Sequence, residues 1–123
     1  MVEDRLTDGK RIAQLLASEV TGHERSLASL SVADSDRDAE PTADGAFAYA
    51  VDRDGERVAE VYIHPDRARV EFLAAPDAVA EAAESEGLRV RPKAVRPPRT
   101  LVFVEDGAQV KRLLPALRAV AEE

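Results

Sequence analysis

The sequence predicts an α+β fold in which helices pack on one face of a mainly antiparallel sheet. Two turn-forming stretches, around Gly55 and Pro65, separate segments of alternating apolar residues, which indicates a β-meander. Amphipathic helical segments lie on both sides of this region. The chain has 123 residues, of which 45% are hydrophobic, and this suits a single α+β domain over residues 1–123. The expected order of elements is α-β-β-β-β-α-β-β-α.

The first third of the chain predicts a helix, a strand and a loop. Residues 7–20 repeat apolar side chains at helical spacing, and Thr7 or Asp8 can cap the helix. Residues 28–32 alternate apolar side chains with serine, as a half-buried strand does. Residues 34–45 contain five acids and no apolar period, which predicts a mobile loop.

Residues 47–73 predict three strands joined by two turns. The first turn suits a three-residue hairpin with Gly55 in the left-handed conformation. The second suits a type I turn with Pro65 and Asp66 as its central pair. These turns predict the cross-strand pairs Tyr49–Ala59, Phe47–Val61, Val61–Val70 and Ile63–Ala68. Both registers place Val61 on the same apolar face, which also holds Phe47, Tyr49, Val51, Ala59, Ile63, Ala68, Val70 and Phe72.

The second half of the chain predicts a helix, two strands and a broken helix. Residues 76–87 begin with proline and end with glycine, as a short helix does. Residues 88–95 predict an edge strand, because Pro92 has no N–H to donate. The apolar run 100–105 is typical of a strand buried on both faces. Pro115 removes a hydrogen bond inside the last helix at a cost of about 3 kcal/mol, so a kink or break is expected there.

The composition is strongly acidic and poor in lysine. Asp and Glu total 24 and Lys and Arg total 17, of which only three are lysines, so the formal net charge is -7. In this respect the chain resembles the small uncharacterised proteins of haloarchaea, which implies a halophilic protein but no activity. The sequence has no cysteine, no apolar run of about 18 residues and no signal-peptide pattern. A cytoplasmic protein without a membrane segment is therefore expected.

Two sets of side chains are candidates for a ligand or partner surface. On the outer face of the meander, Tyr62 and Arg69 would be cross-strand neighbours, close enough for a cation–π contact. In the basic stretch 88–99, alternation places three positive charges on the solvated side of the edge strand. Acids elsewhere, with loop 34–45 as one candidate, could balance this stretch. The candidate surface comprises Tyr62, His64, Arg67, Arg69, Arg89, Arg91 and Lys93.

Three functions are compatible with these features. The first is a non-enzymatic interaction or accessory domain with a protein partner or a second copy. The second is nucleic-acid binding through the arginine-rich strand, which high salt and few aromatics disfavour. The third is binding of, or an enzyme acting on, a small anionic ligand through Tyr62, His64 and Arg69. Neither His23 nor His64 has a partner at metal-ligand spacing, and no nucleophile motif or glycine-rich loop occurs. No catalytic residue, metal or cofactor is therefore expected.

Overall fold

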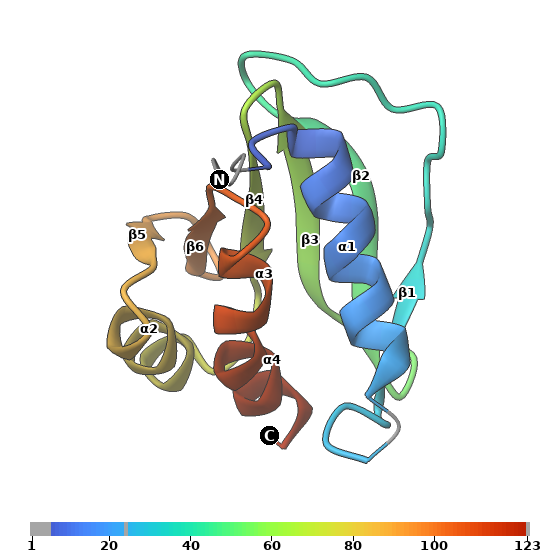
Figure 1. The fold of residues 1–123 in the computed structure, drawn as a ribbon. Coiled ribbons are helices and arrows are strands. Elements are labelled where there is room, and N and C mark those ends of the chain that lie inside the picture. Colours follow the sequence, from blue (N-terminus) through green and yellow to red (C-terminus); the bar gives the residue numbers. More distant parts are fainter. Residues whose placement is uncertain (1–5, 24, 123) are drawn as a thin grey trace, which may run out of the picture.

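The computed structural model describes residues 6–23 and 25–122, and it confirms the predicted α+β order (Figure 1). The last helix consists of two pieces. The elements are α1 (Gly9–Gly22), β1 (Leu30–Ala33), β2 (Ala46–Arg53), β3 (Glu56–His64), β4 (Arg67–Phe72), α2 (Pro76–Ser85), β5 (Arg89–Lys93), β6 (Arg99–Val104), α3 (Gln109–Arg112) and α4 (Leu114–Ala121).

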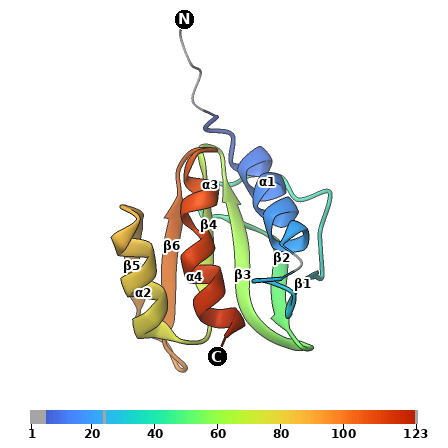
Figure 2. The ribbon, with the colours of Figure 1, turned by 60° about the horizontal axis from the view of Figure 1, so that its bottom comes forward.

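The strands form one antiparallel sheet in the order β1-β2-β3-β4-β6-β5. Figure 2 shows α1, α4 and α2 side by side over one face of this sheet. Val61, Val70 and Val102 on that inner face are fully buried and belong to the hydrophobic core. Within the described part of the chain, no helix covers the opposite face, here called the outer face. The predicted edge position of β5 is confirmed.

The turn between β3 and β4 sets the predicted register, whereas the turn between β2 and β3 does not. Val61 pairs with Val70 and both are buried, so this part of the meander is confirmed. The first hairpin has a two-residue turn rather than three, because Asp54 and Gly55 both have positive φ (50° and 87°). Two positive φ angles define a type I′ turn, for which Asp-Gly is a preferred sequence.

A β-bulge changes the face on which Phe47 lies. Tyr49 pairs with Val61 rather than with Ala59, and the next pair along β2 is Phe47 with Tyr62. Ala48 is therefore an extra residue in β2, and an extra residue reverses the alternation of side chains beyond it. The expectation that Phe47 belongs to the inner apolar face is wrong.

Local contacts define where the helices begin and break. The Asp8 carboxylate accepts the Arg11 N–H at 3.1 Å and caps α1, as predicted. A Cβ at Gly9 would lie 1.9 Å from the carbonyl oxygen of His64, so only glycine allows α1 to contact the β3–β4 turn this closely. The predicted break is confirmed, since α3 ends before Pro115 and α4 contains it. Over 6–23 and 25–122, the helices are too short or too polar to cross a membrane.

Candidate functional site

All seven candidate residues project from the outer face of the sheet. Paired residues of neighbouring antiparallel strands lie on the same face. The pairs Tyr62–Arg69 and His64–Arg67 join β3 to β4, and Phe103 of β6 pairs with both Arg69 and Arg89. Alternation along β5 then places Arg91 and Lys93 on the same side as Arg89. The sheet brings these side chains together, but their surroundings divide them into two groups.

His64 is held as a neutral ring. It is 3% exposed, with Nδ1 at 3.0 Å from the Ala43 carbonyl oxygen and Nε2 at 2.9 Å from Arg69 Nη1. A guanidinium can only donate, so Nε2 accepts and Nδ1–H donates to Ala43. Burial, together with the positive charges of Arg67 and Arg69, lowers the pKa of His64 and opposes a second proton.

The Arg69 side chain is already occupied by contacts within the molecule. Its guanidinium carbon lies 4.6 Å from the centre of the Tyr62 ring, which confirms the predicted cation–π contact. Its Nε donates to Glu71 at 2.9 Å, and Nη1 donates to the Asp44 carbonyl at 3.1 Å as well as to His64. Arg69 therefore ties the loop before β2 to two central strands.

Two glutamates complete this group. Glu71 is 2% exposed, and Arg99 donates to it at 2.9 Å and to Glu60 at 2.7 Å. The Tyr62 hydroxyl also donates to Glu60, at 2.8 Å. Burial alone would raise the pKa of Glu60, but these hydrogen bonds and one from Arg57 leave it below its ordinary value. We call this set the central cluster: Glu60, Tyr62, His64, Arg69, Glu71 and Arg99.

Arg99 is absent from the predicted candidate surface, because the prolines within residues 96–99 indicate a connection or a strand end. Arg99 begins β6, directly before the buried Thr100. Alternation from a buried position predicts an outward side chain at the preceding residue. The burial of Thr100 on the inner face is known only from the structure, because the apolar run 100–105 shows no alternation in the sequence.

The second group, the basic edge, consists of Arg89, Arg91 and Lys93 on β5. The Arg89 and Lys93 side chains are 58% and 45% exposed, and they reach Glu105 and Glu71 at 3.2 Å and 3.6 Å. Arg91 is exposed, and no other described residue forms an ion pair or hydrogen bond with its side chain. The acidic loop 34–45 follows β1 at the opposite edge of the sheet, so the expectation that it balances the basic stretch is wrong.

Arginine side chains cover the aromatic rings of the outer face. The guanidinium carbons of Arg89 and Arg67 lie 4.6 Å and 5.9 Å from the Phe103 ring centre. These side chains bury Phe103, even though no described helix or strand packs over the outer side of β6. Tyr62 carries Arg69 on its face and meets the Phe47 ring edge-on at 5.8 Å. These ring faces are not presented for stacking with a nucleic-acid base.

The chemistry available on this face is ionic and hydrogen-bonding. Among the residues that the structure describes, no group of three or more His, Asp and Glu side chains is arranged to hold a metal ion. The arginines can bind carboxylates or phosphates. Arg57 of β3 is exposed but paired with Asp34 and Glu60, whereas Arg89 of β5 is exposed with Glu105 as its ion-pair partner.

Comparison with known proteins gives a family but no individual relative. No curated protein and no solved structure matches the chain. A protein-family model described as "Family of unknown function (DUF7993)" matches residues 1–123, the whole sequence. The chain therefore belongs to the DUF7993 family.

Proposed function

We propose that the protein is a non-enzymatic interaction domain of a high-salt cytoplasm, and that it binds an acidic protein segment along β5. One observation carries the proposal: the basic edge is exposed and only partly paired in a chain whose net charge is -7. Exposed and only partly paired positive charges on an edge strand favour a partner of opposite charge.

Strand addition is the binding mode that suits this edge. β5 pairs only with β6, so one side of its backbone has no strand partner within the described residues. An added strand gains main-chain hydrogen bonds, except from Pro92, which has no N–H, and alternate carboxylates on it would lie opposite Arg89, Arg91 and Lys93. In molar salt the Debye length is about 3 Å, so charge pairing weakens. The main-chain hydrogen bonds carry no net charge, and they would retain affinity there.

The other candidate functions find less support in the geometry. A symmetric pair of β5 strands from two copies would oppose like charges, which is destabilising. Nucleic-acid affinity depends on counterion release and falls as salt rises, and the aromatic faces are already covered by arginines. Binding of or catalysis on a small anion by Tyr62, His64 and Arg69 would first have to break their mutual contacts.

The test is a titration with a capped octapeptide of alternating Thr and Glu, followed by amide NMR spectra in dilute buffer and in molar potassium chloride. Shifts are expected along residues 89–93 and are expected to persist at high salt. The triple variant Arg89→Gln, Arg91→Gln and Lys93→Gln should bind more weakly. The triple variant Arg25→Gln, Arg112→Gln and Arg118→Gln changes the net charge equally at exposed positions elsewhere and is the matched control.

The control should bind as the parent does. Equal weakening in both triple variants would show that only net charge matters, and the β5 site would be abandoned. Shifts confined to β1, at the other edge, would have the same consequence. Tight binding of duplex or single-stranded DNA at molar salt, lost in the β5 variant, would favour the nucleic-acid function instead.

A further inference from the structure

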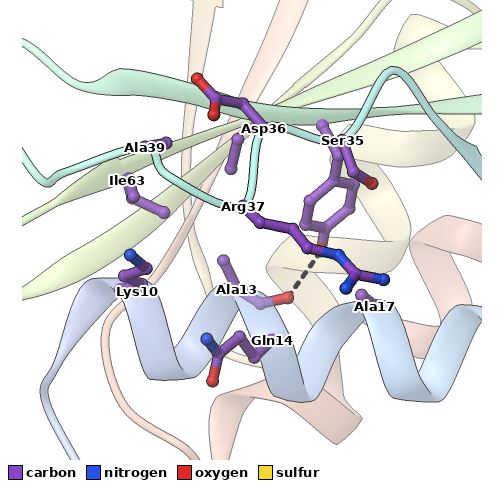
Figure 3. Close-up of a pocket in the computed structure, with 11 residues that line it drawn as sticks. Lys10, Ala13, Gln14, Ala17, Ser35, Asp36, Arg37, Ala39 and Ile63 are labelled. Atoms are coloured by element: carbon purple, nitrogen blue, oxygen red, sulfur yellow. Dashed lines mark hydrogen bonds between the residues drawn. The ribbon is translucent and has the colours of Figure 1, made fainter.

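A cavity of about 340 Å³ lies between α1 and the loop that leads from β1 to β2 (Figure 3). It is far from β5 in the strand order and independent of the proposed function. Small-molecule sites span about 300–1,000 Å³, so this volume suits a small ligand. The lining residues are Lys10, Ala13, Gln14, Ala17, Ser35, Asp36, Arg37, Ala39, Ala48, Tyr49 and Ile63.

Small side chains on both walls keep the cavity open. Four of the lining residues are alanines, two on α1 and two on the loop and β2. The Tyr49 hydroxyl donates to the Ala13 carbonyl at 2.8 Å. This hydrogen bond joins the sheet to the helix, so the hydroxyl proton is not available to a ligand. The Asp36 N–H donates to the Ala48 carbonyl at 2.8 Å and holds the loop on β2. The floor of the cavity is therefore apolar and built from fixed elements.

The rim of the cavity is positively charged. Arg37 extends from the loop toward α1, with its guanidinium above Ala17, and Lys10 lies at the other end (Figure 3). Among the described residues, none forms an ion pair or hydrogen bond with the Arg37 side chain. The Lys10 side chain forms an ion pair of 3.6 Å with Glu40, whose side chain is 80% exposed. The Asp36 carboxylate points away from α1 and accepts the Asp38 N–H.

We infer that this cavity binds a small organic carboxylate with an apolar body. The apolar part fills the space beside the alanines and Ile63, and the carboxylate is bound by the Arg37 guanidinium at one end of the rim. Lys10 at the other end adds positive charge without contacting the carboxylate. The ligand carries a negative charge because the charged side chains that face the opening, Arg37 and Lys10, are both cations, and the partner of Lys10 is itself exposed. It has an apolar body because a polar one would lose its hydrogen bonds to water without finding replacements on the cavity floor.

The probe is sodium octanoate, compared with octanol and octylamine, in ligand-observed NMR and calorimetric titrations in dilute buffer. Octanoate should bind, octanol more weakly, and octylamine least. Arg37→Gln should weaken octanoate about fivefold or more and leave octanol unchanged, since it removes a charged hydrogen bond alone. Ala17→Leu should weaken both octanoate and octanol by filling the cavity.

Two matched variants control for net charge and for added bulk. Arg118→Gln removes an exposed arginine from α4, and Ala78→Leu adds the same side chain to the exposed side of α2. Both should bind octanoate as the parent does. Leucine is nearly as good a helix former as alanine, so Ala17→Leu is expected to fold. If it does not, Arg37→Gln in the exposed loop still decides the outcome.

Three results would overturn the inference. One is equal affinity of octanol and octanoate in dilute buffer, and another is an unchanged octanoate affinity in Arg37→Gln. The third is amide shifts that avoid α1 and residues 35–39. These results are distinguishable from failure of the β5 proposal, because one titration is read at α1 and residues 35–39 and the other at β5, and the binding-site variants differ.

Discussion

The central cluster and the basic edge contain the same kinds of side chain, yet they differ in almost every contact. In the central cluster Arg69 and Arg99 meet buried carboxylates at hydrogen-bond distance. At the basic edge the ion pairs are longer and the side chains about half exposed. Strands β3 and β4 have a neighbour on each side that supplies a partner, whereas β5 has one neighbour only. The position of a strand in the sheet thus decides whether its charges are satisfied within the fold.

The largest effect that separates the two regions is expected from Glu71→Gln. Removing one partner of a buried ion pair leaves the other charge uncompensated, and the partial exposure of its partners reduces the cost to about 2–4 kcal/mol. Arg91→Gln at the basic edge should stay within about 0.5 kcal/mol, as surface substitutions usually do. Urea unfolding of both variants measures the contrast, and similar losses in the two would remove the distinction between the regions.

The next effect concerns the glycine beside His64 and Arg69. Gly45 has a φ of 92°, and a Cβ there would lie 2.8 Å from Arg69 Nη1 and 3.0 Å from His64 Nε2. Gly55 has a φ of 87° with no atom within 4 Å of its Cβ position, so it is the matched control. Alanine at either site should cost about 1–2 kcal/mol for the left-handed backbone. The loss should be larger for Gly45→Ala, and equal melting midpoints would contradict the packing described around the ring.

His64 predicts a pH dependence that the basic edge does not share. Its pKa is lowered in the folded protein, so the unfolded chain binds the proton first as pH falls below about 6.5. The free energy of unfolding should therefore decrease below that pH, by at most about 1.4 kcal/mol per pH unit, until the lowered folded pKa is reached. His64→Gln, which can still accept from Arg69, should remove this component. Identical pH profiles for the parent and the variant would rule it out.

The smallest effect is the response to salt. The chain carries a formal net charge of -7, and molar potassium chloride should raise its melting midpoint by screening self-repulsion. Replacing Arg89, Arg91 and Lys93 by Gln takes the net charge from -7 to -10, because three positive charges are lost. That variant should depend on salt more steeply than the parent. A parent midpoint that is unchanged or lower at high salt would remove the high-salt part of the proposed function.

Local sequence signals predicted the elements, the edge position of β5 and the Tyr62–Arg69 contact, because turns and alternation act over a few residues. They did not predict the bulge at Ala48, since its alanine fits either pattern and the choice depends on packing against α1 and β3. The close contact at Gly9 was also missed, because the carbonyl it meets belongs to a turn more than fifty residues along the chain. The cavity was missed for the same reason, as its walls come from separate segments between Lys10 and Ile63.

The bulge at Ala48 has a consequence for how members of the family can diverge. One inserted residue keeps Tyr49 in the core and moves Phe47 from the inner face of the sheet to the outer face. A relative of the same length whose β2 paired without the bulge would keep Tyr49 opposite Val61, but the residue at position 48 would lie beside Tyr62 in place of Phe47. Gain or loss of the bulge is therefore a means of changing the surface while Tyr49 stays in the core.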